Sequence, residues 1–339
     1  MSQYVYSIVL LIAISSQGYA QTKDSKCDDP GKWCENIWYC KEDSYPEKYK
    51  TCGNDGLVDR VCCDPIYNQT KSRKQCDALY KKIEIDEYGN RDYDSIKPSP
   101  DILTESFPYV AALGHRNGSK TDWLCAGSLI SNKYILTAAK CLNGNVNIVR
   151  LGDLDLNRDD DEVDPQEYGV IKEIKHPKYI APAVYNDIGL IELNSMVRIT
   201  KFVKPGCIFD ESELRDKLWQ ESGYKDPGSK DVLTSIGLIE LAKRACHLYF
   251  NSDRFANQIP FGLDDDTQLC GSSVYARGDC QTDIGGPLSH RDLNYIDANF
   301  IIGVVTIPKP CSTTTNKPGL YTRVSNYAPW IESIVFPES

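Results

Sequence analysis

Short runs of β-branched and aromatic residues, separated by turn residues, recur along the chain after residue 106. The clearest runs are residues 109–113, 134–137, 146–151, 188–193 and 300–306. Each is about the length of one strand, and the polar turn segments between them recur regularly. This pattern predicts an all-β barrel or sandwich in the C-terminal two thirds of the chain.

The N-terminal part has a different pattern. The first twenty residues carry no charge and contain a short apolar run, residues 8–14, followed by Gly18 and Ala20 in a small-x-small arrangement. This predicts a secretory signal, with an uncleaved membrane anchor as the alternative. No later segment approaches the ~20 apolar residues that a membrane span needs. Residues 64–106 are rich in Lys, Asp, Tyr and Pro, which predicts an exposed linker with Lys71, Arg73 and Lys74 in solvent.

Charge and cysteine content narrow the class of protein. The formal net charge is −10, which opposes binding to nucleic acid or to an anionic membrane. The chain has 14 cysteines, no Cys-x-x-Cys pair and 4 histidines, which favours disulfides over metal clusters. A disulfide framework indicates an oxidising, extracellular location. Six cysteines lie within residues 27–63, where a small domain would need them because it can bury little apolar surface.

Three short motifs suggest a family. Residues 280–288 read Cys-Gln-Thr-Asp-Ile-Gly-Gly-Pro-Leu, residues 136–141 read Leu-Thr-Ala-Ala-Lys-Cys, and residues 186–190 read Asn-Asp-Ile-Gly-Leu. In this order they resemble the nucleophile, base and acid motifs of chymotrypsin-like serine proteases. Residues 123–130 and 317–324 extend the resemblance. It implies two six-stranded β-barrels with a cleft between them, and a short closing helix, residues 327–334, packed through Trp330 and Ile334.

The same motifs depart from the family where the chemistry occurs. Ile284 stands at the serine position, Lys140 at the histidine position and Thr282 at the glycine of the oxyanion hole, while the acid, Asp187, is retained. Isoleucine has no heteroatom that could attack a carbonyl carbon. The resemblance therefore predicts a protease-like domain that does not hydrolyse peptides.

Lys140 has a structural explanation. Without a histidine, Asp187 would be buried without a partner, and a lysine could supply the opposite charge. We favour a buried Lys140–Asp187 ion pair. The alternative is a lysine that extends into solvent, with Asp187 bonded to backbone and hydroxyl groups.

The cysteine doublet at positions 62 and 63 gives the N-terminal module a resemblance to the clip domain of arthropod proteases. That resemblance implies the pairs Cys27–Cys62, Cys34–Cys52 and Cys40–Cys63. The chymotrypsin-like resemblance implies Cys125–Cys141, Cys246–Cys270 and Cys280–Cys311. Clip-domain proteases also tether the linker to the protease domain, which implies Cys76–Cys207.

Two further kinds of site are predicted. Asn68 and Asn117 begin Asn-x-Ser/Thr sequences, the acceptor pattern for N-glycosylation. Residues 153–164 are strongly acidic, in the place where some relatives bind Ca²⁺. Asp153 matches one family ligand and Asp164 lies beside the second. A solvated charge run is the default interpretation and a calcium loop the alternative; no cofactor is required.

The resemblance gives the domain plan and an expected function. The plan is a signal peptide at 1–20, a clip domain at 27–63, a linker at 64–106 and an inactive serine-protease-like domain at 107–339. We expect a secreted, non-catalytic cofactor in an arthropod immune cascade, in prophenoloxidase activation and melanisation or in Toll signalling. Clip-domain proteases, prophenoloxidase or microbial polysaccharide would be its partners. Two alternatives are a decoy that sequesters a protease or its substrate, and a hydrolase with an unrecognised nucleophile.

Overall fold

The computed structural model describes residues 70–80, 106–158, 164–210, 218–224, 231–273, 283–291, 298–310 and 317–337, and the backbone of three further strands. These three are β1 (Trp33–Asn36), β2 (Thr51–Asn54) and β3 (Asp59–Cys63). They form an antiparallel sheet in the order β1-β3-β2 within the predicted clip domain. The chain divides into two compact units, one holding this sheet and the other holding all elements from α1 onward.

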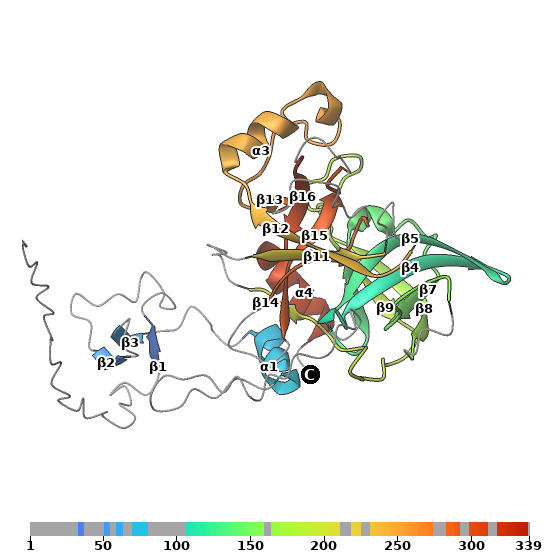
Figure 1. Ribbon diagram of the computed structural model, residues 1–339, viewed down its shortest axis with the longest axis horizontal. Helices are drawn as coiled ribbons and strands as arrows, with labels where there is room; N and C mark the ends of the chain where they lie inside the picture. The colour runs from blue at the N-terminus through green and yellow to red at the C-terminus, as the bar shows by residue number, and fades with distance from the viewer. Residues whose placement is uncertain are drawn as a thin grey trace, which may run out of the picture. The chain divides into compact units, whose positions relative to one another are not determined.

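The larger unit contains two barrels (Figure 1). The strands of the first are β4 (Val110–Asn117), β5 (Lys120–Leu129), β6 (Tyr134–Thr137), β7 (Ile148–Leu151), β8 (Gln166–Lys175) and β9 (Gly189–Leu193). They close in the order β4-β5-β6-β9-β8-β7.

The second barrel follows in the chain. Its strands are β11 (Trp219–Gly223), β12 (Thr234–Glu240), β13 (Gln268–Ser273), β14 (Pro287–Arg291), β15 (Asn299–Ile307) and β16 (Gly319–Arg323). Pairing of β15 with β16 closes this ring, and β10 (Cys207–Ile208) adds a short parallel strand beside β15. The predicted all-β, chymotrypsin-like double barrel is confirmed.

β15 connects the cores of the two barrels. All nine of its residues are buried. Ile301 packs in the core that includes the first barrel, whereas its neighbours Phe300 and Ile302 pack in a second core around Trp219. Alternating side chains of a strand point to opposite faces, so a strand covered on both faces reads as one apolar run.

The described part of the larger unit also contains helices. They are α1 (Lys71–Leu79), α3 (Lys243–Phe250) and α4 (Ala328–Val335), with the 3₁₀ turns η4 (Ala139–Cys141), η5 (Asp253–Phe255) and η6 (Val324–Tyr327). None of the described helices is long and apolar enough to cross a membrane.

α4 is the predicted closing helix, but its most buried face differs from the expected one. Ala328, Ile331 and Val335 are buried, three and four residues apart as one helical face requires. Trp330 and Ile334 are only half buried beside this face. Trp330 makes an edge-to-face contact with His176 at 5.0 Å between ring centroids.

α1 corrects the prediction that this part of the linker is exposed. Thr70 caps the helix by accepting from the Arg73 N–H, and Cys76 bridges to Cys207 on β10. The Tyr80 side chain is buried, and its hydroxyl donates to the Pro205 carbonyl over 2.6 Å. Residues 70–80 are therefore a helix docked on the protease-like domain.

The basic residues of α1 also have specific contacts. Lys71 Nζ donates to the Phe336 carbonyl over 2.8 Å, where it satisfies a group at the end of α4. The Arg73 guanidinium lies 5.0 Å from the centroid of the Phe300 ring. The expectation that these two side chains are simply solvated is wrong.

Candidate functional site

Asp187 lies just before β9 and its side chain is fully buried. Its Oδ1 accepts a hydrogen bond from the Lys140 backbone N–H over 2.9 Å, and its Oδ2 accepts one from the Thr306 hydroxyl. The Thr322 hydroxyl donates to the Asp187 carbonyl over 3.0 Å. Since a buried carboxylate is costly without partners, these contacts hold Asp187 at one position where the two barrels meet.

Lys140 lies on η4, directly after β6. Its Nζ is 3.0 Å from Asp187 Oδ2 and donates to the Thr306 carbonyl over 2.7 Å. The side chain keeps 23% of its surface exposed, whereas that of Asp187 has none. The structure therefore contains the ion pair that the sequence analysis favours, and the lysine does not simply extend into solvent.

Ile284 belongs to a loop that is attached to both barrels. Its carbonyl accepts from the Ala126 N–H on β5 over 3.0 Å, and the next N–H, of Gly285, donates to the Val305 carbonyl on β15 over 2.8 Å. The Ile284 side chain is half buried against the first core. Its carbonyl oxygen lies 3.7 Å from Cys141 Sγ, so the loop reaches the residue next to Lys140.

Gly285 is required by this loop. Its φ is +84°, and a Cβ there would lie 2.2 Å from the Thr137 hydroxyl oxygen and 2.5 Å from the Ala126 carbonyl oxygen. Only glycine combines this backbone conformation with so close an approach. The geometry that presents position 284 is thus kept, although its side chain is a hydrocarbon.

Among the described residues around Asp187, charged groups and hydroxyl groups are engaged with one another. Lys140 and Asp187 neutralise each other, and the Thr306 hydroxyl donates to Asp187. The nearby Thr137 hydroxyl donates to the Ala126 carbonyl over 2.7 Å. Nucleophilic catalysis needs a hydroxyl or thiol hydrogen-bonded to a free base, and these side chains do not form such a pair.

Comparison with known proteins identifies the family. A family model for trypsin matches residues 101–331. The chain belongs to the trypsin family.

Several insect members of the trypsin family are similar in sequence. The chain is 30% identical to phenoloxidase-activating factor 1 of Holotrichia diomphalia, in an alignment covering 72% of this chain and 71% of the relative. It is 28% identical to phenoloxidase-activating enzyme 1 of Spodoptera litura, covering 84% and 82%. It is 31% identical to serine protease snk of Drosophila melanogaster, covering 68% of this chain but 55% of that protein.

A solved structure agrees with the fold. Neuropsin, a serine protease expressed in the limbic system of mouse brain, superposes with a TM-score of 0.54 at 24% identity. The match covers 69% of this chain and 97% of neuropsin. At this identity the likeness concerns the trypsin-family fold alone.

The four histidines of this trypsin-family chain have contacts with residues other than Asp187. His176 packs against Tyr327 and Trp330, and burial lowers its pKa. His247 lies 2.9 Å from Asp265, and His115 lies 2.6 Å from a backbone carbonyl. His290 is half exposed on β14, whereas its neighbour Ser289 is buried and accepts from Tyr109. Neighbouring residues of a strand point to opposite faces, which accounts for this difference.

The described residues include three disulfides, Cys76–Cys207, Cys125–Cys141 and Cys246–Cys270, and these join pairs that the resemblances imply. Cys280–Cys311, the three pairs Cys27–Cys62, Cys34–Cys52 and Cys40–Cys63, and the residue Thr282 lie outside the residues whose side chains are described. They stay predictions, as does the signal peptide at 1–20.

The predicted calcium ligands have other partners. Asp153 is buried and paired with Arg150, and Asp164 is paired with Arg198. Among the residues that the structure describes, no group of three His, Cys, Asp or Glu could hold a metal ion. Calcium binding thus gains no support from the described side chains and stays a prediction.

The two predicted glycan acceptors differ in position. Asn117 is exposed at the turn between β4 and β5, where a glycan would have room. Asn68 lies outside the described residues.

The second barrel contains a buried acid that the sequence analysis does not predict. Glu221 on β11 is fully buried and accepts from the Tyr321 hydroxyl over 2.5 Å. Burial raises the pKa of Glu221 to about 8; Asp283 also raises it, while the Tyr321 hydrogen bond and Lys309 lower it. A signal was available, because Glu221 lies two residues after the buried Trp219 and a strand places both on one face.

Proposed function

We propose that this trypsin-family chain is a secreted, non-catalytic cofactor or adaptor in an extracellular protease cascade of arthropod innate immunity. Prophenoloxidase activation and melanisation is the cascade that we favour, with Toll signalling as the other. Clip-domain proteases and prophenoloxidase would be its partners. Two of the similar insect proteins are named for phenoloxidase activation, which supports the choice of cascade.

One observation carries the non-catalytic part of the proposal. Ile284 occupies the loop position at which the family resemblance has serine, and the backbone of that loop is held as a glycine-dependent turn. Lys140, at the histidine position, is engaged with Asp187 and the Thr306 carbonyl. A fixed shell without a nucleophile still offers its loops for binding, because loops on a rigid scaffold commonly carry recognition.

The chemical half is tested on purified, secreted protein. A fluorophosphonate probe should leave the chain unlabelled, and a broad panel of fluorogenic peptides should show no turnover above buffer, with an active clip-domain protease as the positive control. Fluorophosphonates react with an activated serine, so a covalent adduct on this chain, located by mass spectrometry, would refute the proposal.

The cascade half is tested separately. The protein is added to a reconstituted mixture of a phenoloxidase-activating protease and prophenoloxidase, and phenoloxidase activity is followed in time. A cofactor raises the output in a dose-dependent manner. A reduced output would instead identify the decoy function, and no change over a hundredfold concentration range would exclude this cascade.

A further inference from the structure

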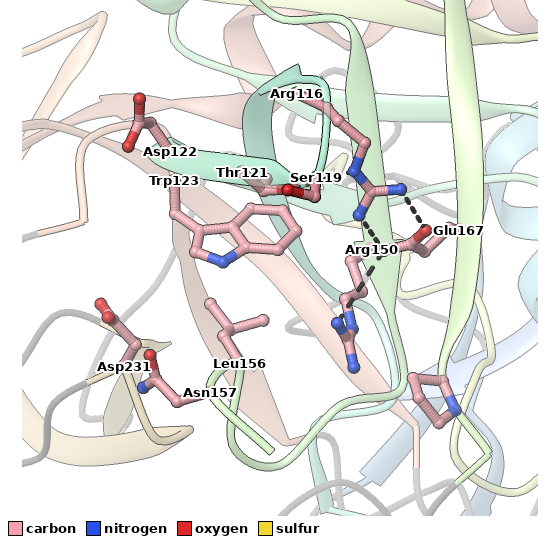
Figure 2. A pocket seen from close by; sticks show the side chains of 11 residues that line it. Arg116, Ser119, Thr121, Asp122, Trp123, Arg150, Leu156, Asn157, Glu167 and Asp231 are labelled. Carbon is pink, nitrogen blue, oxygen red and sulfur yellow. Dashed lines mark hydrogen bonds and ion pairs between the residues drawn. The ribbon is translucent and has the colours of Figure 1, made fainter. Parts of the chain in front are cut away.

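A polar pocket of about 870 Å³ lies on the first barrel, and neither Lys140 nor Ile284 is among its lining residues. Side chains from the β4–β5 hairpin, the loop after β7, the start of β8 and residue 231 line it (Figure 2). A volume of this size suits a ligand side chain together with part of its backbone. Nothing in the proposed function accounts for the pocket.

Trp123 provides a fixed aromatic surface in this pocket. It stands opposite Gly114 in the β4–β5 register, and a Cβ on Gly114 would come within 2.7 Å of its ring. The indole therefore rests against the glycine backbone, and any larger residue at 114 would displace it. Figure 2 shows the ring above Leu156, with its edge toward the side of the pocket that carries Asn157 and Asp231.

The two arginines of the pocket are already paired. Arg116 donates to both carboxylate oxygens of Glu167, over 2.7 and 2.6 Å, which raises the pKa of the guanidinium. Arg150 is paired with the buried carboxylate of Asp153. Their charges are therefore largely compensated within the protein, which weighs against the pocket as an anion site.

Asp231 has no such compensation. Its side chain makes no hydrogen bond or ion pair with any residue in the described part of the chain, although its backbone is firmly held. The Asp231 carbonyl accepts from the Leu156 N–H over 3.1 Å, and the next residue, Val232, bridges to Asp155. The backbone at 231 has φ of +70°, an uncommon conformation for a residue other than glycine and one often associated with functional sites.

The surrounding charge has the same sign as Asp231. Asp122, also in the pocket lining, is exposed and pairs with the exposed Lys120. In the sequence, the pocket residues Asn157 and Pro165 are connected by a segment rich in Asp and Glu, and the whole chain carries −10. A negative field of this kind attracts cationic partners and repels anionic ones.

We propose that this pocket binds an arginine or lysine side chain of a partner protein. The cation would lie on the face of Trp123 and pair with the Asp231 carboxylate, while Asn157 and Thr121 line the space for the partner's backbone. An aromatic face and an unpaired carboxylate are the two groups that recognise such a cation. The inference extends the proposed function by naming a surface, and it does not depend on whether the domain hydrolyses peptides.

The first experiment uses two small probes on the intact secreted protein. Saturation-transfer NMR measures the dissociation constants of acetyl-Gly-Gly-Arg-Gly-Gly-amide and of the same peptide with citrulline, which has nearly the same shape but no charge. We expect the citrulline peptide to bind about tenfold more weakly, because it loses the ion pair and most of the cation–π attraction. Equal binding of the two peptides would overturn the inference.

Variants assign the binding to the pocket. Asp231→Asn keeps the shape of the side chain and tolerates positive φ, and Trp123→Leu removes the aromatic face. Each substitution should weaken binding of the arginine peptide about fivefold or more. Trp123→Phe should have an intermediate effect. Asp253→Asn is the matched control, because it changes the charge by the same amount at a residue that is exposed on η5. Melting temperatures within a few degrees of the parent protein establish that the variants are folded.

A carbohydrate probe separates the competing class of ligand. Chitin hexamer could also stack on an indole, and the pocket offers several polar groups. If the hexamer binds in a manner that depends on Trp123 and the arginine peptide does not bind, the site recognises sugar and the inference is wrong. If Asp253→Asn weakens the peptide as much as Asp231→Asn does, the attraction is nonspecific and the inference is equally wrong. Neither result would bear on the fluorophosphonate test of the proposed function.

Discussion

Two fully buried carboxylates, one beside the first barrel and one inside the second, are held in opposite ways. Asp187, beside the first barrel, has a lysine cation 3.0 Å away. Glu221, inside the second, has the Tyr321 hydroxyl as its hydrogen-bond partner and a pKa raised to about 8. A buried acid can thus be accommodated by a cation or by retaining its proton. The two solutions predict different responses to mutation and to pH.

The largest effect is expected when the cation is removed. Lys140→Met keeps most of the side-chain volume but leaves the Asp187 charge buried, which should cost about 3–5 kcal/mol. Asp187→Asn should cost less, because the ammonium retains the Thr306 carbonyl and access to solvent. Urea unfolding of both variants, compared with the parent, measures the difference.

The double variant Lys140→Met/Asp187→Asn completes this thermodynamic cycle. It should recover part of the loss of Lys140→Met, because no unpaired charge remains buried. Additive losses would mean that the two side chains do not interact, and an unchanged stability of Lys140→Met would mean that the lysine extends into solvent.

The next effect concerns Glu221 and depends on pH. Its pKa is raised from 4.5 to about 8 in the folded protein. The stability that its protonated form provides is therefore complete below about pH 4.5 and is lost as the pH rises through about 8. Glu221→Gln does not titrate, so it should gain stability relative to the parent as the pH rises, by on the order of 4 kcal/mol between pH 5 and pH 8.

Melting temperatures from pH 5 to 8.5 test this prediction. The parent and Glu221→Gln should be similar at pH 5, and the variant should melt higher at pH 8. Glu240→Gln is the control, because Glu240 is exposed on the adjacent strand β12. Melting curves for Glu221→Gln that run parallel to the parent at all pH values would show that Glu221 titrates normally.

The strands of the barrels could be predicted from the local pattern of apolar residues. The contacts that distinguish the two carboxylates could be predicted only in part. Residues 134–137 are predicted as a strand and form β6, because β-branched and apolar runs are local signals. The Lys140–Asp187 pair could also be predicted, since the motifs place both residues at one site. The burial of Glu221 could have been predicted only from the alternation that starts at Trp219. Residues 219–223 are too short and too polar a run to be predicted as a buried strand.

α1 could not be found in this way. Its sequence is polar, and its partners are far away in the chain: Ser72 donates to Glu332, and Thr70 to Asp210. Such contacts leave no periodic apolar signal, so the segment has the composition of a linker. The pocket with Asp231 is similar, because its residues come from four separate segments that only the folded domain brings together.

The smallest expected effect tests the hydrogen bond between Tyr321 and Glu221. Tyr321→Phe removes the hydroxyl that donates to Glu221 Oε2, and losing one buried hydrogen bond should cost about 1–2 kcal/mol at pH 6. That hydrogen bond lowers the pKa of Glu221, so its removal should also shift the loss of stability to higher pH. Melting temperature against pH measures both changes.

Tyr249→Phe is the matched control for this last prediction. The Tyr249 hydroxyl, on α3, is buried and has no hydrogen-bond partner among the described residues, so its removal should be neutral or stabilising. If Tyr321→Phe behaves like Tyr249→Phe, with no loss of stability and no shift along the pH axis, the hydroxyl does not support Glu221. The acid of the second barrel would then depend on its retained proton rather than on the tyrosine, in contrast with the lysine-paired Asp187.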